Sequence, residues 1–224
     1  MGKSGLGWVD TSGAPWNLGF DYFYGQPDQA GCHNMYPVGL NDTAPSGPRA
    51  TVFDNTTALE FPQNVGASRE RCMQQGGGGC WYTHDAWTNN TLRLIGKEGE
   101  RIREEGPGAD PFMLYVAYTD PHAGGWYGAK ENGAPVPSDG DYASKPWPDV
   151  ERDHASVISN YLDRDVGRIF DAIRDAGLDD DTVVFFASDN GEGQARRRSP
   201  ASRRLRPRST ARRRYTLPAP HPRP

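Results

Sequence analysis

Three short stretches of this sequence carry side chains suited to chemistry on an oxyanion. Asp189 and Asn190 are adjacent and offer two hard oxygen ligands of the kind that Ca²⁺ or Mg²⁺ binds. His122 follows a proline, and its imidazole could bind an oxyanion or donate a proton to a leaving group. Lys3 lies in a glycine-rich stretch and could reach an anionic ester as a flexible point charge.

Each of these stretches also has an ordinary explanation. Asp189-Asn190-Gly191 is a common turn sequence. A single histidine in a loop is usually neither a ligand nor an acid, and a lysine near a terminus is most often only solvated. These residues therefore form a site only if the fold brings them together.

Two short apolar runs precede His122 and Asp189. Residues 112–118 and 182–188 are continuous apolar runs bounded by proline or turn residues, as expected of strands buried on both faces. In an open α/β sheet the ligand crevice lies outside the carboxyl ends of the strands. We therefore expect the polar residues that follow both strands to share one edge of a sheet.

Amphipathic helices are expected next to these strands. Residues 155–173 carry apolar side chains at three- and four-residue steps until Gly177, and a second helical pattern runs from Thr83 to the break at 104–110. The order helix, strand, loop, helix, strand predicts an α/β fold with a largely parallel central sheet flanked by helices. Residues 1–80 lack periodicity and predict a loop-rich segment over that sheet.

Composition narrows the class of protein. The 224 residues suffice for one domain, and 27 glycines with 19 prolines predict much loop. No run approaches the roughly 18 apolar residues of a membrane span, and the N-terminus lacks the apolar run of a signal peptide. The three cysteines form no C-x-x-C pair, which disfavours zinc. One internal disulfide is possible, and we favour Cys72 with Cys80.

Residues 192–224 differ from the rest of the chain. This segment is rich in arginine and proline and has one acidic residue, Glu192, so the net charge of −4 conceals a basic tail and an acidic remainder. Such a tail could neutralise nucleic-acid phosphates, but it has no recognisable reader motif, which disfavours nucleic acid as a partner. We interpret it as a disordered segment translated in a shifted frame. Residues 1–191 are then the folded domain.

Six motifs stand in a consistent order along residues 2–191. They are Gly2-Lys3-x-Gly5-Leu6-Gly7, Gly19-Phe20-Asp21-Tyr22-Phe23-Tyr24-Gly25, Cys32-His33-Asn34-Met35-Tyr36-Pro37, Tyr82-Thr83-His84-Asp85, Pro121-His122 and Ser188-Asp189-Asn190-Gly191. Their joint pattern resembles the type I sulfatases of the alkaline phosphatase superfamily. Residues 1–191 would then be part of a sulfatase catalytic domain with the layered fold of that superfamily, incomplete here.

The resemblance implies hydrolysis of a sulfate ester by a formylglycine, which is made from the cysteine or serine of a C-x-P-S-R motif beside bound Ca²⁺. Asp189 and Asn190 resemble one pair of calcium ligands. Lys3 resembles the lysine that contacts the sulfate, and His122 resembles the histidine near the leaving oxygen. The substrates would be sulfated small molecules or sulfated glycans, as for arylsulfatases.

The sequence departs from the family at the nucleophile. No cysteine or serine is followed by x-P-S-R, and the paired aspartates that precede the lysine motif in the family have no counterpart. Gly5 stands where many relatives have a histidine, and Ser4 where tryptophan is usual. We therefore expect no sulfatase turnover from these residues, because covalent catalysis requires its nucleophile.

Other interpretations stay open. A phosphatase or phosphodiesterase of the same superfamily normally binds two metals through additional histidine and aspartate ligands. The sequence has only five histidines, which disfavours this alternative. A non-catalytic remnant would bind anions in the crevice, or nucleic acid through the basic tail. The N-x-T sequons at Asn41, Asn55 and Asn89 would suit a secreted or lysosomal protein.

Overall fold

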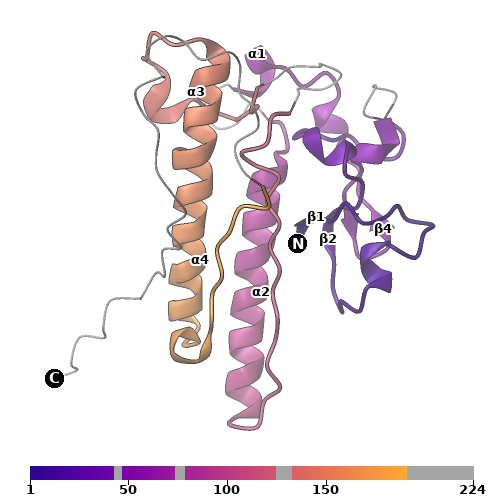
Figure 1. Ribbon diagram of the computed structural model, residues 1–224, viewed down its shortest axis with the longest axis vertical. Coiled ribbons are helices and arrows are strands. Elements are labelled where there is room, and N and C mark those ends of the chain that lie inside the picture. The colour runs from indigo at the N-terminus through magenta and orange to yellow at the C-terminus, as the bar shows by residue number, and fades with distance from the viewer. Residues whose placement is uncertain (43–46, 74–78, 125–132, 191–224) are drawn as a thin grey trace, which may run out of the picture. The chain divides into compact units, whose positions relative to one another are not determined.

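The computed structural model describes residues 1–42, 47–73, 79–124 and 133–190. The chain divides into two units, residues 1–182 and residues 183–224, and each is described by itself. The first unit combines a small sheet with long helices, which confirms the α/β class (Figure 1). The predicted basic tail at 192–224 lies outside the described residues.

The sheet of the first unit has the strand order β1-β2-β3-β4. The strands are β1 (Gly2–Lys3), β2 (Tyr24–Gln26), β3 (Phe53–Asp54) and β4 (Thr57–Ala58). β1 and β2 pair in parallel, whereas β2 with β3 and β3 with β4 pair antiparallel. The sheet of the described residues is therefore mostly antiparallel and not largely parallel as predicted, because the chain returns against β2 at β3 and the short connection from β3 to β4 forms a hairpin. A Cβ at Gly25 would lie 1.9 Å from the carbonyl oxygen of Gly2, so only glycine allows β1 and β2 to approach this closely.

Residues 112–118 run beside β1 on its other side. The Ala117 amide donates to the carbonyl oxygen of Met1 at 2.9 Å, and the Lys3 amide donates to that of Ala117 at 2.8 Å, in a parallel pairing. The expectation that this segment is buried on both faces is wrong, because Met113 is 75% and Tyr115 60% exposed. Side chains alternate along an extended segment, and the helices cover only the face that carries Phe112 and Leu114.

The predicted helices are confirmed. α2 spans Thr83–Glu105 and is followed by Gly106 at φ 78°. A second helical run comprises α3 (Asp149–Ser156), the π-helical segment η6 (Val157–Asp163) and α4 (Arg164–Asp175), followed by Gly177 at φ 71°. Glycine at these positions allows the left-handed backbone that closes a helix.

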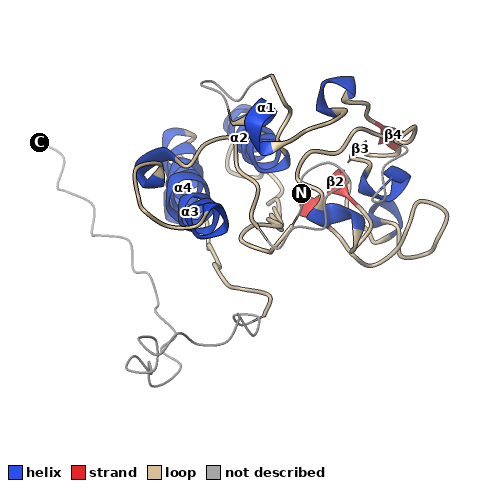
Figure 2. Ribbon diagram, turned by 90° about the horizontal axis from the view of Figure 1, so that it is seen from above, coloured by secondary structure: helices blue, strands red, loops and turns tan. Residues whose placement is uncertain are grey.

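α2 and α4 lie side by side in both views (Figures 1 and 2). Ile95 from α2, Ile173 from α4 and Leu178 form an apolar cluster between them, and Phe112 and Leu114 pack against it. The cluster therefore joins the long helices to the segment that leads to His122.

The described residues among the first eighty are loop-rich, as predicted. They contain the short helix α1 (Arg69–Cys72) and the 3₁₀ turns Pro15–Asn17, Gly31–His33, Gly47–Ala50 and Pro62–Asn64. The disulfide between Cys72 and Cys80 is confirmed, with the Cα atoms 5.4 Å apart. A second core cluster, which includes Met35, Tyr36 and Val157, contains Cys72, and Cys80 packs against it.

In the second unit, the described residues 183–190 form no strand. The prediction of a buried strand at 182–188 is wrong, since Val183 is 78% and Phe185 91% exposed. An apolar run becomes a buried strand only where neighbouring segments supply backbone partners and cover. Within the described part of the chain, no helix has the length and apolar character needed to cross a bilayer.

Candidate functional site

Lys3 ends β1, and backbone bonds on both sides hold it there. The Lys3 amide donates to Ala117, and the next amide, that of Ser4, donates to the carbonyl oxygen of Gln26 at 3.1 Å. Because β1 runs parallel to residues 112–118, the carboxyl ends of both segments point the same way. The structure thus places Lys3 at the sheet edge from which the chain continues to His122.

His122 lies in a tight turn directly after that segment. Its amide donates to the carbonyl oxygen of Thr119 at 3.0 Å, which closes the turn. Thr119 and Asp120 are buried, whereas the His122 side chain is exposed. The start of the turn is therefore anchored in the interior, and the imidazole of His122 lies at the surface.

His33 is the residue that links Lys3 with His122. It ends the 3₁₀ turn Gly31–His33, whose first amide, that of Gly31, donates to Asp28 Oδ1 at 2.6 Å. Its ring stacks on the ring of His122, with centroids 3.9 Å apart and planes 9° apart. Burial and, after it, the charges of His122 and Lys3 lower the pKa of His33 to about 4, against the opposing charge of Asp28. The neutral form of His33 therefore predominates at pH 7.

The Nε2 atom of His33 is buried and has no hydrogen-bond partner among the described residues. A buried polar atom without a partner carries a desolvation cost that a ligand can relieve. Two stacked imidazoles beside the positive charge of Lys3 form a corner suited to an oxyanion, because imidazole N–H groups and an ammonium all bind anionic oxygen. We call Lys3, His33 and His122 the anion corner.

Sequence reasoning did not assign a role to His33. The residue stands in the motif Cys32–Pro37, but a histidine there is indistinguishable from a packing residue until its partner is known. Its neighbour Cys32 is a free, fully buried cysteine. Burial raises the pKa of the Cys32 thiol to about 12, so it stays protonated and is a poor nucleophile. The anion corner thus contains no activated cysteine.

Asp189 and Asn190 end the described part of the second unit. Both are exposed, and the Ser188 hydroxyl donates to the backbone oxygen of Asn190. Two oxygen-bearing side chains have the right chemistry for Ca²⁺ but are too few, since this ion takes six to eight oxygens. No group of three or more His, Cys, Asp or Glu side chains in the described residues could hold a metal. The calcium site stays a prediction.

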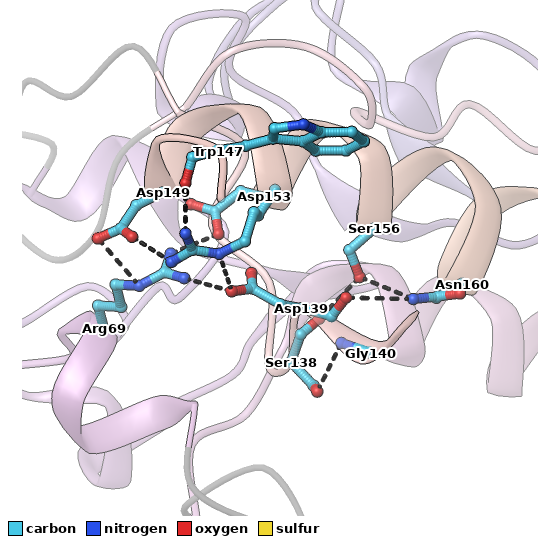
Figure 3. A network of polar contacts seen from close by, with 10 residues as sticks. Arg69, Ser138, Asp139, Gly140, Trp147, Asp149, Asp153, Ser156 and Asn160 are labelled. Atoms are coloured by element: carbon cyan, nitrogen blue, oxygen red, sulfur yellow. Dashed lines mark hydrogen bonds and ion pairs between the residues drawn. The ribbon is translucent and has the colours of Figure 1, made fainter. Parts of the chain in front are cut away.

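A separate polar cluster joins α1 to the start of α3 (Figure 3). Arg69 bonds Asp139 Oδ2 at 2.7 Å and also Asp153, and Arg152 donates to the same oxygen of Asp139 at 2.9 Å. Burial raises the pKa of Asp153, against the opposing effect of Arg69. Because two guanidinium groups already bind the carboxylates, this cluster is a structural joint and not a cation site.

The described residues form an α/β fold in which Lys3, His33 and His122 gather at the carboxyl ends of β1 and of residues 112–118. A sequence model of the sulfatase family matches residues 1–212, so the chain belongs to that family. It is also 27% identical over 177 residues to a protein named uncharacterized sulfatase YdeN from Escherichia coli (strain K12).

The match to YdeN covers 79% of this chain but only 23% of that protein. The activity and substrates of a whole sulfatase are therefore proposals for this chain. No solved structure matches it.

Proposed function

We propose that this chain contributes the sulfate-binding corner of a sulfuric ester hydrolase of the arylsulfatase type, and that these residues bind a sulfate ester without turning it over. The stacked pair of His33 and His122 beside Lys3 carries this proposal. The ligand would be the sulfate group of a sulfated small molecule or a sulfated glycan.

Charge supports an anionic ligand at this corner. Lys3 acts electrostatically on both His33 and Cys32, so its positive charge reaches the 3₁₀ turn Gly31–His33. Asp28 also faces His33, but its carboxylate is bound by Arg49 at 2.6 Å. Lys3 therefore contributes positive charge beside His33, and the carboxylate of Asp28 is already bound by a guanidinium.

Turnover needs a nucleophile that these residues lack. No C-x-P-S-R motif is present, and Cys32 is held as a buried thiol. We propose that Lys3 contacts the sulfate and that His122 faces the leaving oxygen. Asp189 and Asn190 would supply two of the six to eight oxygen ligands that a Ca²⁺ ion takes.

Binding is tested by titrating ¹⁵N-histidine-labelled protein with inorganic sulfate and with 4-nitrophenyl sulfate. We expect the ring signals of His33 and His122 to shift together and to saturate. Lys3→Ala and His122→Ala should each weaken binding about tenfold, the loss of one charge-assisted contact. Lys97→Ala, an exposed lysine on α2, is the matched control and should change nothing.

Absence of saturable shifts with both probes would reject sulfate-ester binding by this chain. Turnover is measured separately, as release of 4-nitrophenolate. We expect none above background, and release that Cys32→Ser abolishes would contradict the assignment of Cys32 as an inert thiol.

A further inference from the structure

We infer that His84 is a buried imidazolium that positions His122, by holding Asp120 inside the turn Thr119–His122. The inference deepens the proposed function, because His122 is the residue proposed to face the leaving oxygen. His84 belongs to none of the chemistry assigned above and lies near the start of α2.

Both ring nitrogens of His84 face carboxylates. Nδ1 lies 3.1 Å from Asp120 Oδ2, and Nε2 lies 3.2 Å from Asp165 Oδ2. His84 is fully buried at 0% exposure, so water cannot separate these pairs. A neutral imidazole has one N–H and one lone pair, and a lone pair directed at a carboxylate would be repelled. Nε2 makes no aligned hydrogen bond among the described residues, so its contact with Asp165 is an ion-pair contact only. The two carboxylates together favour a proton on both nitrogens.

The network around Asp165 is saturated with cations. Arg164 Nε donates to Asp165 Oδ1 at 2.6 Å, Arg168 bonds the same oxygen at 3.1 Å, and the Thr88 hydroxyl donates to Oδ2 at 2.9 Å. Asp165 thus keeps its charge without His84, and holds one side of the ring in place.

Asp120 depends on His84 much more strongly. Its Oδ2 accepts from the Tyr82 hydroxyl at 3.0 Å, and within the described residues His84 is the one cation in contact with it. Its other oxygen, Oδ1, is buried without a partner among those residues. A buried carboxylate that lost its counter-charge would have to move toward water or take up a proton.

Aromatic rings hold the imidazolium from its faces and edge. Tyr118 stacks on it with centroids 4.5 Å apart, and Tyr161 meets it edge-on at 6.0 Å. A third carboxylate, that of Asp85, interacts electrostatically with His84, although burial raises the pKa of Asp85. Two carboxylates in direct contact and a third nearby favour the protonated ring, as do the π faces that surround it.

A movement of Asp120 would displace His122, because the two residues belong to the same turn and are separated only by Pro121. Asp120 lies inside the turn that the bond from the His122 amide to the Thr119 carbonyl closes. The outward face of the turn carries the ring that stacks on His33. His84 therefore acts on the anion corner through two residues of backbone, without touching a ligand.

The charge of His84 is tested on the unmodified chain by long-range ¹H–¹⁵N correlation of ¹⁵N-histidine-labelled protein from pH 5 to pH 10. We expect one histidine to keep protons on both nitrogens at pH 7.5 and to be missing from the spectrum of His84→Gln. A His84 ring with a single protonated nitrogen at pH 7.5 would overturn the inference.

The positioning role is read from the nuclear Overhauser contact between the rings of His33 and His122. His84→Gln should weaken this contact at least threefold while the far-ultraviolet circular dichroism stays unchanged. His84→Gln with Asp120→Asn removes both charges, leaves a neutral hydrogen-bonded pair and should restore the contact. His154→Gln, on α3, is the matched control and should leave it intact.

A contact that survives in folded His84→Gln would show that His84 only fills space, and would overturn the positioning role. If that variant does not fold, the same contact is followed in the unmodified chain as pH rises from 8 to 10, where it should weaken with loss of the His84 proton. Neither readout uses sulfate. Failure of sulfate binding with both readouts as expected would therefore reject the proposed function alone.

Discussion

The imidazole rings of His33 and His122 lie parallel at a centroid distance of 3.9 Å. Two cationic rings at this distance would repel each other, so the stack is most favourable when at least one ring is neutral. Burial already disfavours the charge on His33. His33 is therefore the neutral ring of the stack near neutral pH.

The first prediction concerns the pH dependence of His33. Its folded-state pKa of about 4 lies below the ordinary value of 6.5, so the folded chain binds fewer protons than the unfolded chain between these values. The stability from neutral His33 is fully present above pH 6.5 and declines as pH falls toward 4. His122→Ala should raise the pKa of His33 only in part, because burial is the larger cause. An NMR titration of His33 in both proteins measures this, and an unchanged pKa would contradict the stacking effect.

The second prediction concerns the stability that His84 provides. Burial disfavours its charge, but the bonds to Asp120 and Asp165 outweigh burial and raise the pKa of His84 to about 9. The folded chain thus binds more protons than the unfolded chain, and this stability is fully present below pH 6.5 and lost as pH rises through 9.

His84→Ala should lower the free energy of unfolding by about 3–5 kcal/mol at pH 6, as expected when one member of a buried charge network is removed. Urea unfolding at pH 6, 8 and 9.5 measures the difference between the unmodified chain and the variant. That difference should shrink toward pH 9.5, and a constant difference would show that His84 contributes packing alone.

The third prediction concerns Arg69, which holds two buried carboxylates on the α3 side (Figure 3). Arg69→Met should lower the free energy of unfolding by about 3 kcal/mol, because Asp139 and Asp153 lose a shared cation. Arg69→Lys should lose less, since it keeps the charge without the fork geometry. Arg101, on α2, forms ion pairs with Glu98 and Glu105 and donates to the backbone oxygen of Asp110, all within one stretch of the chain. Arg101→Met should therefore have a much smaller effect. Equal losses in the free energy of unfolding for Arg69→Met and Arg101→Met would contradict the structural role of the cluster around Arg69.

The fourth prediction concerns the bond between Cys72 and Cys80. Thiol titration in denaturant should find one reactive thiol, that of Cys32, before reduction and three after it. Replacing both bonded cysteines by serine should cost about 2.5 kcal/mol, the chain entropy of so short a loop. Three thiols before reduction would show that the bond does not form under the conditions used.

The fifth prediction compares two glycines. Gly25→Ala would place a methyl group 1.9 Å from the Gly2 oxygen, so it should separate β1 from β2 and displace Lys3 from the anion corner. Gly96→Ala, on α2 with open space around it, should instead stabilise the chain by about 1 kcal/mol. Thermal unfolding measures both, and a neutral Gly25→Ala would argue against the close approach of the two strands.

Local patterns in the sequence determined the elements of this protein well. The apolar repeat that ends at Gly177 and the pattern from Thr83 both correspond to helices, because a helix of this kind is encoded by its own periodicity and its glycine stop. The disulfide and membership of the sulfatase family were also readable, one from cysteine spacing and the other from motif order.

The burial of the two apolar runs could not be predicted from the sequence. Residues 112–118 and 182–188 have the composition of strands covered on both faces, yet Tyr115 and Phe185 are exposed. An apolar run records what a segment can tolerate, whereas its burial depends on which other segments pair with it and cover it.

The sequence by itself determined which residue types were available at the carboxyl edge of the sheet, including Lys3 and His122. Only the tertiary structure decided that His33 would join them and that His84 would lie between Asp120 and Asp165. These contacts connect segments far apart along the chain, and no local periodicity encodes such pairings. Their electrostatics follow from burial, because a charge removed from water takes its protonation state from the groups that surround it.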